Sequence, residues 1–195
     1  MKRLFDILAS ALGVIILSPV LIIIYLLVIT ESKGGGIYSQ TRVGLNGSDF
    51  KLYKFRTMFT GSEKKGLLTV GGRDPRVTKT GYYLRKYKLD ELPQLFNVIE
   101  GSMSLVGPRP EVRKYVDLYS DIQKKVLHVK PGITDYASLE YSNENEILGQ
   151  ATNPEEVYIN EIMPRKLELN LKYIAEKSFL TDLKIILKTI GKIIR

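Results

Sequence analysis

Apolar residues concentrate in one amino-terminal segment, and polar and apolar positions alternate along the rest of the chain. Residues 11–29 are almost wholly apolar and are interrupted only by Gly13, Ser18 and Pro19. A helix of about 19 residues rises close to 30 Å, which is the hydrocarbon thickness of a bilayer. Its roughly 14 Leu, Ile and Val residues favour insertion by roughly 6 kcal/mol. A cleaved signal peptide has a shorter apolar run and a small-residue cleavage site, so we expect residues 1–33 to remain in the membrane as an anchor.

Ser18 and Pro19 lie near the middle of this anchor and predict a kink or a break there. Pro19 cannot donate a hydrogen bond to the carbonyl of Ile15, and its ring pushes that carbonyl away. The Ser18 hydroxyl can satisfy the freed carbonyl. A kinked helix that spans the bilayer and a re-entrant hairpin that leaves on the side it entered both fit this pattern. Basic residues flank both ends of the anchor, so they do not settle its orientation.

Residues 34–178 carry the patterns of a small domain with a short β element. Three consecutive glycines at 34–36 predict a flexible exit from the membrane, and residues 50–56 alternate between apolar or aromatic and basic positions, as in a half-exposed strand. The expected elements are strands at 37–40 and 50–56 around a turn at 44–47, a loop at 61–80, helices at 81–88 and 90–99, an irregular stretch at 101–110, a helix at 111–128, loop and short strand at 129–150, and a helix at 154–177.

The last segment, residues 179–195, has the pattern of a basic amphipathic helix. Its cations recur every three or four residues, and aliphatic residues occupy the other positions: Lys184, Lys188, Lys192 and Arg195 against Leu183, Ile186, Leu187, Ile190 and Ile194. A helix of this kind lies in an anionic membrane interface, although an ordinary helix packed on a core has a similar pattern. Because an anchor is already present, we expect the interfacial location.

The charge balance indicates an anionic partner. The chain has 195 residues, a formal net charge of +8 and a pI of about 9.5. A membrane surface, a phosphorylated small molecule and nucleic acid would each complement that charge. The sequence has neither an RNP-type aromatic motif nor a helix-turn-helix pattern, so we do not expect nucleic acid to be the partner. The absence of Cys excludes disulfides and Cys-based metal sites or nucleophiles.

Familiar catalytic signatures are missing, which narrows the candidate chemistry. His128 is the single histidine, and no G-x-S-x-G motif accompanies it, so we interpret it as structural. There is no P-loop, no G-x-G-x-x-G turn and no D-x-D pair. What remains is the acidic pair Asp90–Glu91 with four cations near turns or element ends: Lys54, Arg56, Arg85 and Arg109. The pair also suits the start of a helix, where acidic residues stabilise the first turn.

Adjacent carboxylates near several cations are suited to metal-assisted phosphoryl transfer. A carboxylate can attack phosphorus, and cations with a hard divalent ion offset its repulsion from an anionic diphosphate. Five ordered blocks make this interpretation specific: Ser18–Pro19, the KFRTM block at 54–58, the LDELPQLFNV block at 89–98, the MSLVGPRP block at 103–110 and the KPGIT block at 130–134. Together they closely resemble the bacterial sugar transferases called monotopic phosphoglycosyl transferases, over nearly the whole chain.

The resemblance implies an α+β fold with a re-entrant membrane helix-hairpin, a small and mainly helical cytoplasmic catalytic domain, and interfacial amphipathic helices. It implies that Asp90 attacks the β-phosphate of a UDP-sugar and is a ligand of Mg²⁺, and that Glu91 assists. The basic positions Lys54, Arg85 and Arg109 would hold the diphosphate and the leaving UMP, and Arg56 is a further candidate for substrate binding. The acceptor would be polyprenyl (undecaprenyl) phosphate at the cytoplasmic face of the inner membrane.

One departure from the family pattern concerns a phosphate contact. Many members carry an Arg in an Asn-Gly-Arg-Asn segment after the Pro-Gly-Ile-Thr block, and Ser142 occupies that position here. The sugar, the glycan pathway and any homo-oligomer stay open. Two alternatives also stay open: a membrane-tethered basic module without enzymatic activity, and an ordinary glycosyltransferase, which would release UDP instead of UMP.

Overall fold

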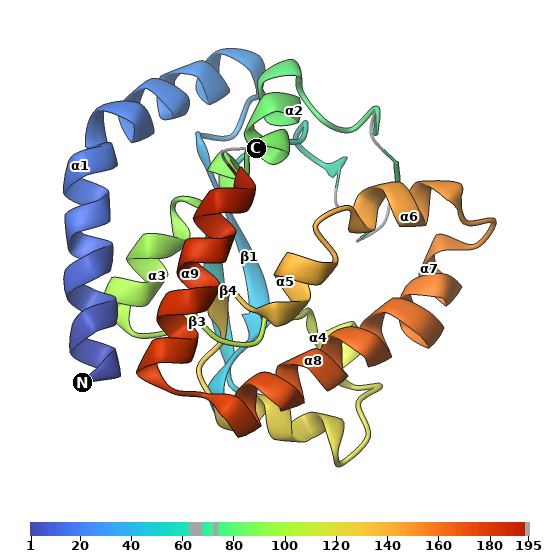
Figure 1. The fold of residues 1–195 in the computed structure, drawn as a ribbon. Coiled ribbons are helices and arrows are strands. Elements are labelled where there is room, and N and C mark those ends of the chain that lie inside the picture. Colours follow the sequence, from blue (N-terminus) through green and yellow to red (C-terminus); the bar gives the residue numbers. More distant parts are fainter. Residues whose placement is uncertain (63–67, 72–73, 194–195) are drawn as a thin grey trace.

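The fold combines many helices with two small sheets. The computed structural model describes residues 1–62, 68–71 and 74–193 (Figure 1). Helices account for most of these residues, and each sheet has two strands. The α+β class predicted from the sequence is therefore confirmed. Part of the loop expected at 61–80 and the last two residues of the expected C-terminal helix lie outside the described residues.

The amino-terminal segment forms one continuous helix, α1 (Lys2–Glu31), with Pro19 inside it. The Ser18 hydroxyl donates a hydrogen bond of 2.8 Å to the carbonyl of Ile15, as predicted. Figure 1 shows that α1 bends over the domain without a turn that would divide it into two helices. In the described part of the chain, α1 is the one helix that is long and apolar enough to cross a membrane. Its exposed side chains include Leu12, Ile15, Ile16, Ile22, Ile23, Leu26 and Leu27.

Both ends of α1 are bonded to the same domain. At its start, the Lys2 ammonium donates to the carbonyl of Val106 at 3.1 Å and pairs with Asp182. At its end, the Glu31 carboxylate accepts a hydrogen bond of 2.9 Å from the backbone N–H of Thr80. Apolar packing supports the second end, where a cluster joins the helix to the domain through Ile24, Val28, Phe55 and Leu84.

A β-hairpin forms the first sheet, as the alternating pattern predicts. Strands β1 (Ile37–Val43) and β2 (Asp49–Phe55) pair antiparallel, and a 3₁₀ turn, η1 (Leu45–Gly47), connects them. Asn46 in this turn has φ 55°, a left-handed conformation that Asn adopts more readily than most residues. The second sheet is a parallel pair, β3 (Ser104–Val106) with β4 (Gly132–Thr134).

The other elements follow the sequence in part. They are α2 (Lys79–Lys86), η3 (Leu89–Glu91), α3 (Gln94–Glu100), α4 (Arg113–Val116), η4 (Gln123–His128), α5 (Tyr136–Glu140), α6 (Glu144–Gln150), α7 (Pro154–Val157), η5 (Tyr158–Ile162), α8 (Met163–Glu176) and α9 (Phe179–Ile193). The long helix predicted at 154–177 is confirmed as the run from α7 to α8, which contains one π turn. His128 ends η4, where it is exposed and does not line the large cavity described below.

The helix predicted at 111–128 is wrong. Only the two short elements α4 and η4 form there, and Ser120 lies between them. Its backbone N–H donates to the side chain of Gln123 at 2.9 Å, and the N–H of Gln123 donates back to the Ser120 hydroxyl at 3.3 Å. These local bonds compete with a helical backbone. The stretch at 129–150 was expected to be loop and strand, but it also contains α5 and α6.

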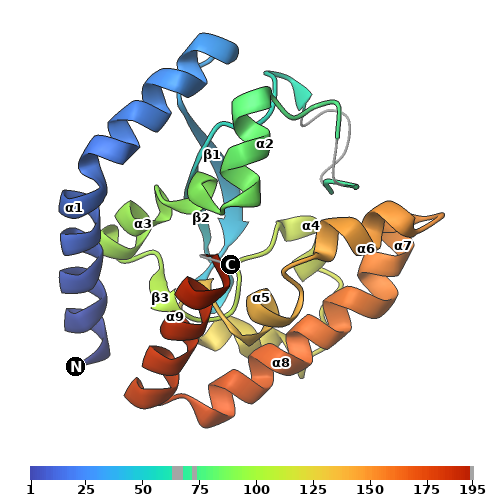
Figure 2. The ribbon, with the colours of Figure 1, turned by 45° about the horizontal axis from the view of Figure 1, so that its top comes forward.

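The C-terminal helix packs on the domain. Ile185 of α9 is 1% exposed and lies in a cluster with Val106 and Tyr173. In both views α8 and α9 diverge from the residues that join them, with α5 between them (Figure 2). The opposite side of α9 exposes Leu180, Leu187 and Ile190. One side of the helix therefore belongs to the core, while the other presents apolar residues outward.

Candidate active site

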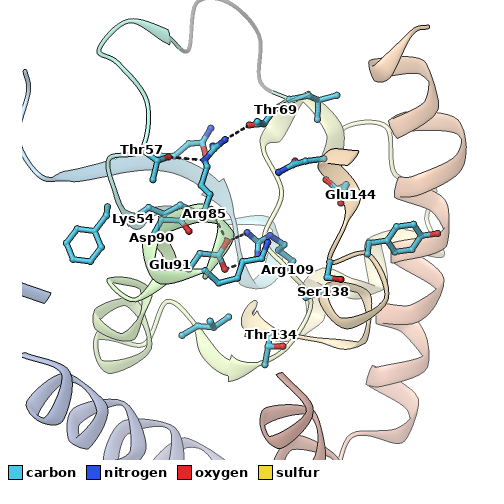
Figure 3. Close-up of a pocket in the computed structure, with 18 of the residues that line it drawn as sticks. Lys54, Thr57, Thr69, Arg85, Asp90, Glu91, Arg109, Thr134, Ser138 and Glu144 are labelled. Atoms are coloured by element: carbon cyan, nitrogen blue, oxygen red, sulfur yellow. Dashed lines mark hydrogen bonds and ion pairs between the residues drawn. The ribbon is translucent and has the colours of Figure 1, made fainter. Parts of the chain in front are cut away.

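One large cavity collects all six residues that the sequence singled out. It has a volume of about 650 Å³, and helices and strands from most of the domain contribute to its wall. Its lining includes Lys54 of β2, Arg56, Arg85 of α2, Asp90 and Glu91 of η3, and Arg109 after β3. Figure 3 shows Lys54, Arg85, Asp90, Glu91 and Arg109 gathered in one region of this cavity.

A tight turn presents the two adjacent carboxylates to the cavity. Lys88 precedes η3 with φ 56°, a left-handed conformation that costs a non-glycine residue about 1 kcal/mol or more. The chain then enters the 3₁₀ turn that carries Asp90 and Glu91, and α3 begins three residues later. The pair lies in the first turn of the 3₁₀ element η3, but it does not cap the α-helix α3, which begins at Gln94 without a side-chain cap, and both residues line the cavity.

Glu91 is held by two cations. Arg109 donates to both of its carboxylate oxygens, with one of these distances 3.2 Å, and the Lys54 ammonium lies 3.3 Å from Oε1. Burial alone would raise the pKa of Glu91, but the charges of Arg109 and Lys54 outweigh burial and hold the pKa well below its usual range. Glu91 is therefore ionised, and its oxygens are committed to organising the two cations.

Asp90 differs from its neighbour because its carboxyl group has no direct partner in the described part of the chain. It is 6% exposed and makes no hydrogen bond or ion pair with any other residue that the structure describes. Burial raises its pKa, and the nearby charge of Lys54 offsets only part of that effect. A buried carboxyl group without a partner is costly, so we expect Asp90 to have a functional role in this cavity.

Arg85 supplies a cation whose charge is not neutralised locally. Its guanidinium donates to the hydroxyls of Thr57 and Thr69, both at 3.0 Å. Within the described ranges, no carboxylate lies within ion-pair distance of it. Burial lowers its pKa from the usual value, although the guanidinium stays charged. Hydroxyl groups fix the orientation of this cation while leaving its charge available to an anion.

Two glycines explain how the fold places Arg109. A Cβ added to Gly132 would lie 2.1 Å from the backbone nitrogen of Gly107, and one added to Gly107 would lie 2.4 Å from the carbonyl oxygen of Lys130. Only glycine allows this approach of two backbones. The next residues are fixed by Asp135, whose carboxylate accepts the backbone N–H of Arg109 at 3.1 Å. The MSLVGPRP and KPGIT blocks therefore form one unit that supports the arginine.

Arg56 also lines the cavity, but its donors are engaged by the backbone. Its guanidinium donates to the carbonyls of Gly34 and Gly35 at 2.6 and 2.9 Å and lies over the ring of Tyr38. The Arg56 side chain therefore fixes the backbone of the glycine segment that follows α1. Its role in substrate binding stays a prediction.

The cavity also contains residues that the sequence analysis did not select: Thr57, Thr69, Thr134, Ser138, Glu144, Lys166 and Lys192. Ser142, at which the resemblance to the family predicts a missing phosphate contact, lines the cavity as well. Glu144 pairs with Lys166 at 2.7 Å, so this cation is neutralised. Thr57 and Thr134 lie in the motif blocks at 54–58 and 130–134, which could have indicated them, whereas the others lie outside the blocks and face the cavity only because of how their segments pack.

The chemistry of the cavity is compatible with a divalent cation. Among the described residues, no group of three acidic, His or Cys side chains could hold a metal without help. Mg²⁺ commonly uses one or two carboxylates and completes its shell with water and substrate phosphates. Asp90, which is buried and has no partner within the described ranges, could supply such a carboxylate, whereas the oxygens of Glu91 already accept hydrogen bonds.

The structure thus combines an apolar helix long enough to cross a membrane with a cavity that gathers buried cations and Asp90, whose carboxyl group has no partner among the described residues. Comparison with known proteins identifies the family of the chain. The model of the bacterial sugar transferase family matches residues 1–195. The chain therefore belongs to the bacterial sugar transferase family.

Named relatives include longer proteins. The chain is 41% identical to the UDP-glucose:undecaprenyl-phosphate glucose-1-phosphate transferase of Klebsiella pneumoniae, with 98% of this chain and 39% of the relative aligned. It is 37% identical to the UDP-N-acetylgalactosamine-undecaprenyl-phosphate N-acetylgalactosaminephosphotransferase of Aeromonas hydrophila, covering 99% of this chain and 43% of the relative. The uncharacterized sugar transferase EpsL of Bacillus subtilis is 38% identical over 100% of this chain and 87% of its own length. The chain thus spans about two fifths of the first two relatives and most of the third.

Proposed function

We propose that the chain transfers a sugar-1-phosphate from a UDP-sugar to undecaprenyl phosphate or a similar polyprenyl phosphate, releases UMP, and so begins the assembly of a surface polysaccharide. The observation that carries this proposal is Asp90, a buried carboxyl group that has no partner among the described residues and lies in a cavity lined by Lys54, Arg85 and Arg109. Transfer of a glucose phosphate or an N-acetylgalactosamine phosphate to undecaprenyl phosphate appears in the names of relatives aligned over nearly the whole chain.

The reaction has two steps at the same carboxylate. An Asp90 oxygen forms a bond to the β-phosphorus of the donor, the phosphoanhydride bond breaks, and UMP leaves with the electron pair. The phosphosugar remains on Asp90 as an acyl phosphate. An oxygen of the acceptor phosphate then attacks the same phosphorus, and the Asp90 carboxylate is released. Asp90 is better placed for this role than Glu91, whose oxygens accept hydrogen bonds from Arg109 and Lys54.

The surrounding cations reduce the repulsion between the Asp90 carboxylate and the diphosphate. Lys54, Arg85 and Arg109 face two carboxylates, which leaves one positive charge in excess. Arg85, which has no carboxylate partner in the described residues, provides that excess at a fixed position. Preorganised charges of this kind act strongly in a site that excludes water. Arg109 shares its guanidinium with Glu91 and would contact the phosphate with its remaining donors.

One excess charge does not neutralise a diphosphate that carries about two negative charges. Asp90 would hold Mg²⁺ together with phosphate oxygens, and the ion would supply charge neutralisation and Lewis acidity when bound. Chelation of divalent cations with EDTA should then abolish UMP release. Undiminished release in EDTA would remove the metal from the proposal.

We propose further that α1 is re-entrant and that the domain lies at the cytoplasmic face of the inner membrane. A straight helix of α1's length would separate its ends by about 45 Å and place them on opposite sides of a bilayer. Lys2 at one end and Glu31 at the other instead bond to the same domain. The bend of α1 (Figure 1), the presence of Pro19 inside the helix and the exposed apolar side chains in its middle support a helix that dips into the bilayer and returns.

The order of product release tests the function. Purified protein mixed with a panel of UDP-sugars, without acceptor, should release about one equivalent of UMP from the correct donor and retain the sugar covalently. Addition of polyprenyl phosphate should discharge the sugar, and steady-state rates should show the parallel lines of ping-pong kinetics. Release of UDP would indicate an ordinary glycosyltransferase, and no nucleotide release with any donor and acceptor would indicate a binding module. UMP release only when both substrates are present would refute the two-step route.

A further inference from the structure

The C-terminal helix α9 turns one cation toward the domain. Ile185, Thr189 and Lys192 are spaced by four and three residues, so they lie on one stripe of the helix. Ile185 is buried in the core, which shows that this stripe faces the domain. Both Lys188 and Lys192 are exposed, but Lys188 lies on the flank of the stripe and does not line the cavity, whereas Lys192 does. The sequence pattern grouped Lys192 with Lys184 and Lys188, but in the structure only Lys192 of these three lines the cavity.

Two contacts anchor this stripe beside the active site. The Thr189 and Thr134 hydroxyls are 2.7 Å apart, and Thr134 directly precedes Asp135, which holds the backbone of Arg109. The Lys192 ammonium donates a 2.5 Å hydrogen bond to the carbonyl of Leu139 in the last turn of α5. Figure 3 shows Thr134 at the lower edge of the cavity, with α9 beneath it.

The charge of Lys192 is available to an anion. Thr189 and Lys192 line the same 650 Å³ cavity as Asp90. No carboxylate of the described residues lies within ion-pair distance of Lys192, and its bond to a carbonyl leaves two of its three donors. Lys54, Arg109 and Lys166, in contrast, are each paired with a carboxylate. Lys192 is thus a cation of the cavity that the donor-binding residues do not neutralise.

The surroundings of Lys192 are suited to an amphiphile. Apolar side chains line the cavity together with it: Leu92, Leu95, Ile133 and Leu139. Leu95 extends to the membrane helix, since a Cβ added to Gly13 of α1 would lie 3.5 Å from its Cδ1. The cavity therefore has an apolar side that leads to the helix we assign to the bilayer. A molecule with a phosphate head and an apolar chain would place its head near Lys192 and its first chain units along these residues.

We propose that Lys192 binds the phosphate of the lipid acceptor, a proposal that rests on the proposed function. It adds a phosphate-binding cation to the wall of the cavity, where Ser142 is another lining residue but carries no charge. The helix that supplies the cation also exposes Leu183, Leu187 and Ile190 on its outer side. The same helix would then contact the membrane and bind the head group of a lipid drawn from it.

Two half-reactions separate acceptor binding from donor binding. Lys192→Ala, Lys192→Arg and the matched control Lys188→Ala would be compared in detergent micelles, so that membrane partitioning does not enter. Lys192→Ala should leave the UMP burst without acceptor within twofold of wild type. It should raise the KM for polyprenyl phosphate at least tenfold, because a charge-assisted hydrogen bond is lost. Lys192→Arg should recover most of that loss, and Lys188→Ala should match wild type in both assays.

Several outcomes would overturn the proposal. A slowed burst with a normal acceptor KM would assign Lys192 to the donor. An unchanged acceptor KM in Lys192→Ala, or an equal rise in Lys188→Ala, would leave Lys192 with no specific role in acceptor binding. A fall in kcat with an unchanged KM would indicate a role in holding α9 alone. Absence of a burst in the wild-type protein would instead refute the two-step route, and the acceptor KM would still report on Lys192.

Discussion

The two adjacent carboxylates should respond in opposite ways to neutralisation. Asp90→Asn should abolish UMP release, since removal of the nucleophile costs several orders of magnitude. It should leave the folded state as stable as wild type or more so. The pKa of Asp90 is raised by burial, which means that its ionisation opposes folding at pH values above the ordinary 3.8. An amide removes that cost near neutral pH.

Glu91→Gln should destabilise the protein because it leaves Lys54 and Arg109 buried without their counter-charge. Removing one partner of a buried pair costs about 3–5 kcal/mol. We expect the lower end, about 3 kcal/mol, because the Arg109 side chain is 32% exposed to the cavity. For a chain of this size, 1 kcal/mol corresponds to about 2–4 °C, so the Tm should fall by about 6–12 °C.

Circular dichroism in detergent would measure both Tm values near neutral pH, and UMP release would be assayed on the same preparations. A Tm for Asp90→Asn that falls as far as that of Glu91→Gln would refute the assignment of different roles. Turnover of Asp90→Asn within tenfold of wild type would remove it as the nucleophile. A Tm for Glu91→Gln within about 2 °C of wild type would show that the ion pairs contribute little to folding.

Two further predictions concern pH and topology. The pKa of Glu91 is lower in the folded state than its ordinary value of 4.5, so the ionised Glu91 side chain stabilises the folded state above pH 4.5 and loses this effect as the pH falls further. The Tm difference between wild type and Glu91→Gln should therefore narrow in acid. A difference that stays constant with pH would contradict this prediction. Because the chain has no Cys, Leu4→Cys provides a single site for labelling, and an impermeant thiol reagent should label it only in lysed cells. Addition of Pro19→Leu should increase labelling from outside the cell. Labelling of Leu4→Cys alone in intact cells would indicate a spanning helix.

Long periodic patterns made part of the fold predictable. The apolar anchor, the hairpin of β1 and β2, and the helical run from Pro154 to Glu176 each repeat one pattern over many residues. The shorter elements depend on individual bonds. Asp135 begins α5 by accepting the backbone N–H of Ser138 at 2.6 Å, and Ser120 interrupts the expected helix by bonding with Gln123. Such contacts have no periodicity, so the pattern could not distinguish α5 from a loop.

The site was predictable only as a set of residue types. The motif blocks identified Asp90, Glu91 and the cations, and all of them line one cavity. The different roles that we propose for them depend on distances: Glu91 is within reach of Arg109, whereas Asp90 has no ion-pair partner among the described residues. The position of Lys192 could not be predicted, because a helix with cations at several positions does not reveal which of its faces packs on the domain.

The contact between Gly107 and Gly132 has a consequence for protein engineering. The parallel strands β3 and β4 carry these glycines or adjoin them, and they place Arg109 and Asp135 within three residues of the contact. A change to either backbone would displace the other, so the two motif blocks behave as one part although 24 residues separate their glycines. A transplant of this site into another scaffold would have to move both segments together. In a deep mutational scan, both glycines should be as intolerant of substitution as the residues that bind substrate, despite carrying no functional group.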